Sequence, residues 1–164
     1  MSTQKTTADG FDAFIADMAS LHMNSDVEFL VEGQRLPGHR QVLASRSEYF
    51  RALLCGSMVE SRQRTVRLKV PLEPFKVILE YLHTGKLPLS SLDVDMLIDV
   101  LDLAHFYCLV SVETLITGYL QQKMSVSHVC AILDAAKHCN REQSIEECHK
   151  FMEQNAYDVL KHDS

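Results

Sequence analysis

The sequence predicts an α+β fold, with a small sheet early in the chain and helices after it. Two observations carry this prediction. Segments between residues 26 and 70 alternate apolar and polar residues, which is the period of a strand with one buried face. From residue 72 onward apolar residues recur every three or four positions, the period of an amphipathic helix. About three strands followed by a larger number of helices favour the α+β class.

The N-terminal segment has two parts. Residues 1–10 contain almost nothing apolar to bury, so we expect them to be disordered. Residues 11–24 carry apolar side chains at helical spacing and predict an amphipathic helix. This stripe is wider than one small domain behind it can cover, which favours packing against a second copy of the chain; an intramolecular cover is the alternative. The stripe consists of Phe11, Phe14, Ile15, Met18 and Leu21.

Residues 26–40 predict a β-hairpin. Apolar residues alternate with polar ones at the start of the segment, from Val27 to Val31. Glu32-Gly33 then predicts the turn between the two strands. Pro37 lacks an amide hydrogen, so the second strand should end there or lie at an edge.

Residues 39–56 predict two short helices. Ser45 followed by Glu48 fits a capping box, and Gly56 predicts a helix end in the left-handed conformation. The predicted buried stripe of this segment consists of Tyr49, Phe50, Leu53 and Leu54.

Further elements follow in order. The patterns predict a strand at 65–70 and helices at 72–85, 91–108, 110–124, 125–139 and 144–160. Ser144 with Glu147 predicts a second capping box, at the start of the last helix.

The composition argues against a nucleic-acid-binding, membrane-spanning or secreted protein. The chain has 164 residues, 46% of them hydrophobic, and a formal net charge of −6, so its surface should repel nucleic acid and anionic lipid. No apolar run is long enough to span a membrane and no secretory signal is present, so we expect a cytoplasmic protein, with the nucleus as the alternative. Five scattered cysteines do not form a disulfide framework.

Catalytic and metal-binding motifs are missing from the sequence. There is no glycine-rich phosphate loop, no nucleophile elbow and no metalloprotease motif. His39 and His105 could act as bases, but neither has a nucleophile beside it in the sequence. The pairs His138-Cys139 and Cys148-His149 are adjacent residues of helices and point about 100° apart, so neither pair chelates easily. We therefore predict no enzyme activity, no metal and no cofactor.

Several motifs in a fixed order resemble the BTB/POZ domain. They are Asp26-Val27 opening a strand, Gly38-His39-Arg40 before Val42-Leu43-Ala44, the Ser47-Glu48-Tyr49-Phe50 helix start, and Tyr81 to Gly85. The resemblance covers residues 11–124 and implies Asp26, His39, Arg40 and Gly85 as fold-defining residues. Residues 125–164 are similar to the helix pair, called the 3-box, that begins the BACK domain in BTB–BACK proteins; a complete BACK domain would need a longer chain.

The resemblance implies a dimeric interaction scaffold. Many BTB–BACK proteins bind the N-terminal domain of cullin-3 and act as substrate adaptors of a ubiquitin ligase, with the substrate held by regions outside this chain. Cullin-binding members carry a hydrophobic-x-Glu motif after the third helix, and Met58-Val59-Glu60 occupies that place. The implied cullin contacts are Leu54, Met58, Glu60, Phe106, Tyr107, Val129, Ile132 and Leu133, and the implied dimer contacts are the stripe of the first helix.

Two other readings stay open. One is a BTB domain that recruits transcriptional co-repressors, which usually lacks a helix pair like residues 126–160. The other is a purely self-associating scaffold, which has no need of the motif at Met58 and Glu60. At the turn between the long helices, Phe106 and Tyr107 are adjacent and cannot both face one core, so we expect one of them to be exposed.

Overall fold

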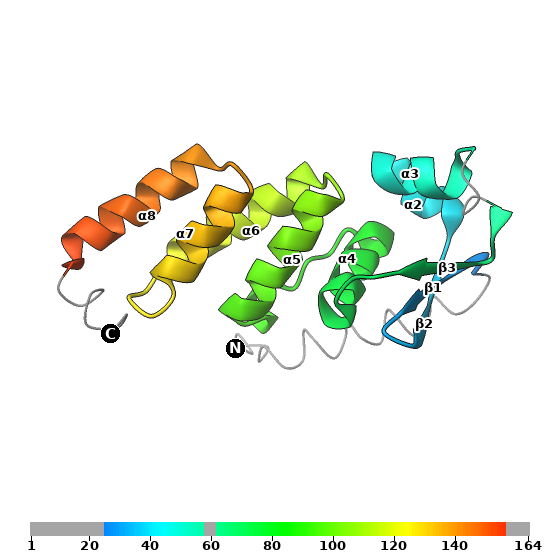
Figure 1. The fold of residues 1–164 in the computed structure, drawn as a ribbon, viewed down its shortest axis with the longest axis horizontal. Helices are drawn as coiled ribbons and strands as arrows, with labels where there is room; N and C mark the ends of the chain where they lie inside the picture. The colour runs from blue at the N-terminus through cyan, green and yellow to red at the C-terminus, as the bar shows by residue number, and fades with distance from the viewer. Residues whose placement is uncertain (1–24, 58–61, 157–164) are drawn as a thin grey trace, which may run out of the picture. The chain divides into compact units, whose positions relative to one another are not determined.

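The computed structural model of the chain describes residues 25–57 and 62–156. The chain divides into two compact units, residues 1–93 and 94–164 (Figure 1). The boundary predicted at residue 124 from the family resemblance lies inside the second unit. Within the described residues, no helix has both the length and the apolar character needed to cross a bilayer.

A three-stranded sheet forms the centre of the first unit. Strands β1 (Val27–Val31) and β2 (Gln34–Gly38) pair antiparallel, and β3 (Thr65–Leu68) lies parallel to β1 on its other side, giving the order β2-β1-β3. The predicted hairpin turn is confirmed, because Glu32 and Gly33 both have left-handed backbone, with φ of 48° and 80°. This geometry matches the right-handed twist of the two strands that it joins.

Three helices of this unit surround one aromatic cluster. They are α2 (Arg40–Arg46), α3 (Glu48–Cys55) and α4 (Leu72–Thr84), with a short 3-10 helix at Leu89–Ser91. Phe29 of β1 is fully buried and meets the rings of Phe50 and Phe75 edge-on, at centroid distances of 5.8 and 5.5 Å. The strand alternation predicted from the sequence therefore places Phe29 where it joins the sheet to α3 and α4.

Two predictions about the ends of α3 are wrong. Its N-cap is Ser47, whose Oγ accepts a hydrogen bond from Phe50 N; the hydroxyl of Ser45 donates instead to Val42 O at 2.8 Å. Gly56 ends α3 with extended backbone, φ −84°, and not in the left-handed conformation. Ser47 takes the cap because α2 already includes Ser45 and the chain becomes extended only one residue after Arg46.

Carboxylates of the hairpin cap two helices across the fold. Asp26 Oδ1 accepts from Arg40 N, at the first residue of α2, at 2.9 Å. Glu32 Oε2 accepts from Leu72 N, at the first residue of α4, at 2.8 Å. A negative group at a helix N-terminus satisfies an amide that has no partner within the helix. The carboxylate of Asp26 therefore fixes the start of α2 against the sheet.

The guanidinium of Arg40 joins two segments that are far apart in the sequence. It donates to Leu54 O, near the end of α3, at 2.8 Å, and also to Gln63 O. Along the sequence, these two carbonyls lie before and after residues 58–61. Gly85 ends α4 with left-handed backbone, φ 74°, and its N–H bonds Tyr81 O at 2.7 Å, as expected for a helix-stopping glycine.

The ring of His83 in α4 is held in its neutral form. Its Nδ1 lies 2.8 Å from Leu79 O and its Nε2 accepts from His39 N at 3.3 Å, so a ring with its proton on Nδ1 satisfies both contacts. Burial lowers the pKa of His83, the bond to Leu79 acts in the opposite direction, and electrostatic interactions with His39 and Arg46 lower the pKa further.

We expect acid to weaken the fold through His83. The folded pKa lies below the unfolded value of 6.5, so the unfolded chain binds the proton more readily, and the free energy of unfolding falls as pH drops below 6.5. The substitution His83→Gln keeps a donor and an acceptor but does not titrate. Urea unfolding at about pH 7.5 and about pH 5.5 should show a smaller loss for the variant than for the wild type. An equal loss in both proteins would contradict this role.

Four helices lie in the described part of the second unit, residues 94–156. They are α5 (Val94–Phe106), α6 (Val110–Gln122), α7 (Val129–His138) and α8 (Glu142–Gln154). Helix α5 packs on α6 and α7, while α8 packs on α7 and α6. The predicted stripes are confirmed as buried, and their members are Leu97, Val100, Leu101 and Ala104 of α5 and Val129, Ile132, Leu133 and Ala136 of α7.

The predicted start of the last helix is wrong. Helix α8 begins at Glu142, with Arg141 as its N-cap, so Ser144 lies in its first turn and not before it. Ser144 is buried, and its Oγ accepts a hydrogen bond from Gln121 Nε2 at 3.1 Å. A serine that the local pattern assigns to a cap is used here to join α8 to α6.

Candidate functional site

The turn between α5 and α6 is defined by main-chain contacts. Leu109 N donates to Ala104 O at 2.8 Å and Cys108 N donates to His105 O at 3.1 Å. This pattern ends many helices and requires one residue with left-handed backbone, a place that Cys108 takes with φ 58°. The turn therefore holds the side chains on either side of it in fixed directions.

An apolar surface lies at this turn. Phe106 is 59% exposed whereas Tyr107 is 1% exposed, which confirms that one of the two aromatic residues faces solvent. Val110, the first residue of α6, is 62% exposed. Exposed aromatic side chains on a rigid support are typical anchors of protein interfaces. Tyr107 belongs to the core, so a partner could touch it only if it left the core, and its predicted contact stays a prediction.

The segment after α3 holds the motif predicted to bind cullin-3. Leu54 is 1% exposed and packs inside the first unit, so its predicted contact also stays a prediction. Met58 and Glu60 lie outside the described residues. The predicted dimer stripe of the first helix, Phe11, Phe14, Ile15, Met18 and Leu21, lies outside them as well.

The predicted groove residues of α7 face the interior of their unit. Val129, Ile132 and Leu133 are 0%, 3% and 7% exposed. Ile132 borders a cavity of only about 10 Å³, which is too small for a side chain of a partner. A partner segment would reach these residues only if the helices separated, so their contact with cullin-3 stays a prediction.

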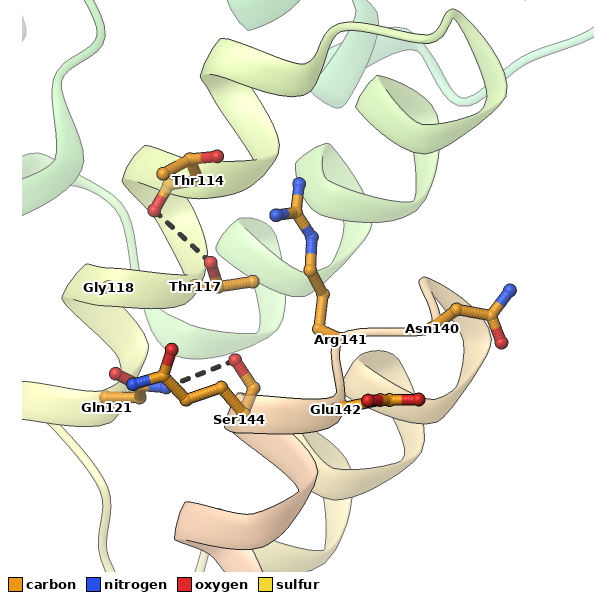
Figure 2. A pocket seen from close by; sticks show the side chains of 9 residues that line it. Thr114, Thr117, Gly118, Gln121, Asn140, Arg141, Glu142 and Ser144 are labelled. Atoms are coloured by element: carbon orange, nitrogen blue, oxygen red, sulfur yellow. Dashed lines mark hydrogen bonds between the residues drawn. The ribbon is translucent and has the colours of Figure 1, made fainter.

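A larger hollow lies between α6 and the start of α8, and its lining is polar (Figure 2). Its volume is about 430 Å³. Thr114 and Gln121 border it from α6, and Arg141 and Glu142 border it from the other side. Hydrogen-bonding side chains of this kind suit a polar or extended segment better than an apolar helix face.

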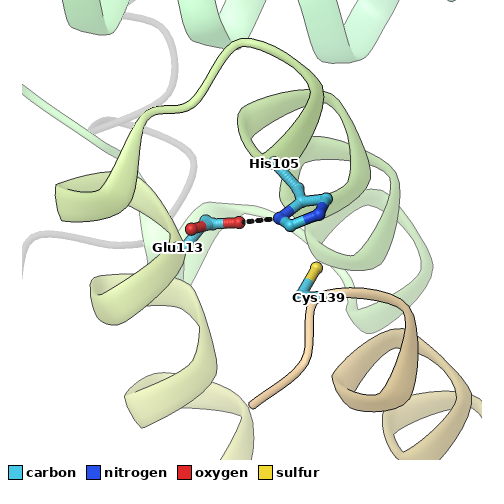
Figure 3. Close-up of side chains that lie close together, drawn as sticks. All are labelled: His105, Glu113 and Cys139. Carbon is cyan, nitrogen blue, oxygen red and sulfur yellow. Dashed lines mark hydrogen bonds and ion pairs between the residues drawn. The ribbon is translucent and has the colours of Figure 1, made fainter.

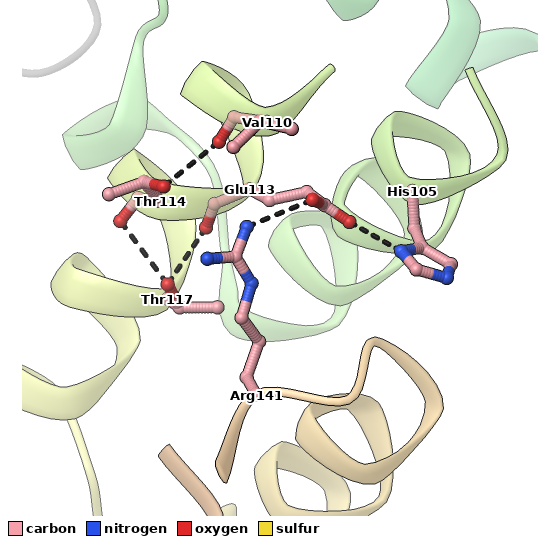
Figure 4. A network of polar contacts seen from close by, with 6 residues as sticks. All are labelled: His105, Val110, Glu113, Thr114, Thr117 and Arg141. Carbon is pink, nitrogen blue, oxygen red and sulfur yellow. Dashed lines mark hydrogen bonds and ion pairs between the residues drawn. The ribbon is translucent and has the colours of Figure 1, made fainter. Parts of the chain in front are cut away.

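A buried carboxylate lies at the centre of the second unit. Glu113 of α6 is 5% exposed; its Oε1 lies 2.6 Å from His105 Nδ1 of α5, and its Oε2 accepts from Arg141 Nη2 at 2.9 Å (Figure 4). Thr117 Oγ1 donates to the main-chain carbonyl of Glu113 at 2.8 Å. Both carboxylate oxygens are thus engaged, which a buried charge requires.

Cys139 lies beside this carboxylate and histidine. A thiol, an imidazole and a carboxylate could be taken for a nucleophile, its base and an orienting group. However, burial raises the pKa of Cys139 to about 11, and the charges of Glu113 and Asp102 act in the same direction. A nucleophilic cysteine needs a lowered pKa, so this arrangement does not favour thiol catalysis.

Comparison with known families decides the class of the protein. The family model of the BTB/POZ domain matches residues 17–124. The chain belongs to the BTB/POZ domain family. BTB/POZ domains are protein-interaction modules, and the match runs from the first compact unit into the second.

Named relatives of this BTB/POZ chain extend the similarity. It is 53% identical to BTB/POZ domain-containing protein 9 of Drosophila melanogaster, over 93% of this chain and 22% of the relative. It is 37% identical to the human protein of that name, over 82% and 22%, and 30% identical to Kelch-like protein 21 of Danio rerio, over 83% and 22%. The chain therefore spans about a fifth of the length of these relatives.

Solved structures confirm the predicted fold. The BTB domain of human gigaxonin aligns with a TM-score of 0.53 at 21% identity, covering 73% of this chain and 97% of that domain. The BTB domain of zebrafish PATZ1 aligns with the same TM-score and identity, covering 74% and 97%. At this identity the likeness establishes the fold alone.

Proposed function

We propose that this BTB/POZ chain is a homodimeric module that binds the N-terminal domain of cullin-3 and serves as the substrate adaptor of a ubiquitin ligase. The substrate binds to parts of the full-length protein outside this chain. The observation that carries the proposal is the similarity to BTB/POZ domain-containing protein 9 and Kelch-like protein 21, which covers 93% and 83% of the chain. This stretch is longer than residues 17–124, so it includes residues of the helix pair, which the co-repressor reading does not need.

The exposed turn between α5 and α6 supports a protein partner. Phe106 and Val110 leave apolar surface in water, and its burial against a helix of cullin-3 would contribute roughly 1.5–3 kcal/mol for each side chain that is fully covered. The main-chain contacts of the turn hold Phe106 before the partner arrives, which limits the entropy lost on binding.

The motif at Met58 and Glu60 supplies the second contact in this proposal. Met58 is unbranched and adapts to an irregular groove on a partner helix. Glu60 adds specificity through hydrogen bonds with the partner more than it adds affinity. Arg40 holds the main chain on both sides of this segment, at Leu54 and Gln63.

Dimerisation is the third part of the proposal. The helix predicted at residues 11–24 would carry a stripe of large apolar side chains, and two such stripes can pack against each other about a two-fold axis. A pair of adaptors then presents two cullin-binding surfaces in one complex.

The proposal is tested by calorimetric titration of the chain with the N-terminal domain of cullin-3, followed by light scattering of the mixture. We expect saturable binding, a complex that contains a pair of each protein, and binding weakened by roughly tenfold or more in Met58→Asp and in Glu60→Lys. A dimer that gives no binding heat would support the purely self-associating reading. Unchanged affinity in both variants would remove the motif from the interface.

A further inference from the structure

Three potential metal ligands from different elements converge in the second unit. His105 comes from α5, Glu113 from α6, and Cys139 follows α7 (Figure 3). One ligand atom of each residue can be chosen so that all three atoms lie within 4.8 Å of one another. The three residues are separated by 8 and by 26 positions in the sequence, so no motif with short spacing marks them.

The donor set suits zinc. An imidazole nitrogen, a carboxylate oxygen and a thiolate sulfur are all common zinc ligands, whereas magnesium and calcium prefer oxygen alone. Bonds of about 2.0–2.3 Å around a tetrahedral ion place neighbouring ligand atoms roughly 3.3–3.8 Å apart. The three ligand atoms, which lie within 4.8 Å of one another, could therefore bind one ion after side-chain shifts of about 1 Å.

The groups around the cluster include two carboxylates, of Glu113 and Asp102, and one guanidinium, of Arg141. A bound dication would hold Cys139 as the thiolate, and the thiol proton would pass to solvent. The contact between His105 Nδ1 and Glu113 Oε1, 2.6 Å long, would open so that both side chains can turn toward the ion.

The surroundings complete the site. Arg141 holds Glu113 Oε2 at 2.9 Å, so the carboxylate is oriented with Oε1 toward the other two ligands; a neighbour that orients a ligand in this way is typical of zinc centres. The side chain of His105 is 39% exposed, which gives an ion access from solvent.

We propose that His105, Glu113 and Cys139 form a zinc-binding site, with water as the fourth ligand. The sequence alone predicts no metal, because His138-Cys139 and Cys148-His149 cannot chelate as adjacent pairs. In the structure, Cys139 of the first pair lies instead beside His105 of α5 and Glu113 of α6. A bound ion would join α5, α6 and the end of α7, and so brace the unit that contains the helix pair.

The test uses the full chain without an affinity tag that binds metal. Cobalt(II) titration should give the near-ultraviolet charge-transfer band of a thiolate–cobalt bond and the visible bands of a tetrahedral ion. Zinc affinity, measured by competition with a chromophoric chelator, should fall by roughly tenfold or more in Cys139→Ser and in His105→Asn. The melting temperature of the wild type should rise with added zinc.

Cys148→Ser is the matched control. Cys148 is also a buried thiol of this unit whose pKa is raised by burial, but it does not belong to the cluster. The control should keep the charge-transfer band and the zinc affinity of the wild type. A wild-type chain that shows no thiolate band with cobalt overturns the proposal, as does equal zinc affinity in the wild type and Cys139→Ser. Should Cys139→Ser fail to fold, the wild-type spectrum and the His105→Asn affinity still decide.

Discussion

Phe106→Asp is expected to weaken binding of the cullin-3 N-terminal domain by about tenfold or more without lowering the melting temperature. The side chain is 59% exposed, so its replacement removes little from the core. In the complex, the new carboxylate would have to lose its water against an apolar surface, which costs more than the lost contact alone. Calorimetric titration measures the affinity, and thermal unfolding at the same protein concentration measures the stability.

Leu115→Asp serves as the control for this variant. Leu115 is another large apolar side chain of the second unit and is 48% exposed, but it lies on α6 five residues after Val110. We expect this variant to bind cullin-3 like the wild type. If both variants lose affinity equally, the effect comes from added negative charge and not from the turn. If neither variant loses affinity, the turn is not part of the interface.

Phe29→Ala is expected to lower the free energy of unfolding by about 3–5 kcal/mol. The side chain is fully buried and touches Phe50 and Phe75 edge-on, so truncation leaves a cavity and removes two aromatic pairs. Because a domain of this size is stable by only about 5–15 kcal/mol, this loss is a large share of its total stability. Urea unfolding at fixed protein concentration measures the change.

Phe29→Leu separates the two causes of that loss. Leucine keeps most of the buried volume but has no ring, so we expect a loss well under half of that in Phe29→Ala. A loss below about 1 kcal/mol in Phe29→Ala would mean that the cluster is not the core of the first unit.

Much of the fold could be predicted because burial leaves a periodic trace in the sequence. The alternation from Val27 to Val31 predicts β1, and the spacing of Phe75, Ile78 and Leu82 predicts α4. The turn was predictable from Gly33, because glycine adopts left-handed backbone readily, whereas the left-handed backbone of Glu32, φ 48°, has no such signal in the sequence.

Helix caps were predicted less well, because the same polar residues serve local and distant partners. Ser47 caps α3, but Ser144 bonds Gln121 across the unit. In both regions the sequence predicted a capping box, from Ser45 to Glu48 and from Ser144 to Glu147. The caps that tie the fold together, from Asp26 and Glu32, come from residues 14 and 40 positions away, where no local signal can point to them.

The polar cluster of the second unit was missed for the same reason. Glu113, His105 and Arg141 come together only when α5, α6 and the start of α8 pack, so their relation does not exist in the linear pattern. The sequence does carry one signal here: Asn140 has left-handed backbone, φ 54°, which is typical of asparagine at a helix end and fixes the position of the next residue, Arg141. For the turn after α5 the sequence predicted that one aromatic residue is exposed, but the choice of Phe106 depended on the direction in which α5 ends.

Arg40 has a consequence for how the segment between Leu54 and Gln63 can change in evolution. One guanidinium anchors the main chain at Leu54 and at Gln63 through backbone carbonyls, which every residue type possesses. Side chains between these anchor points can therefore change without loosening the attachment of the segment. A binding surface on this segment could thus change residue by residue while its two attachment points stay the same.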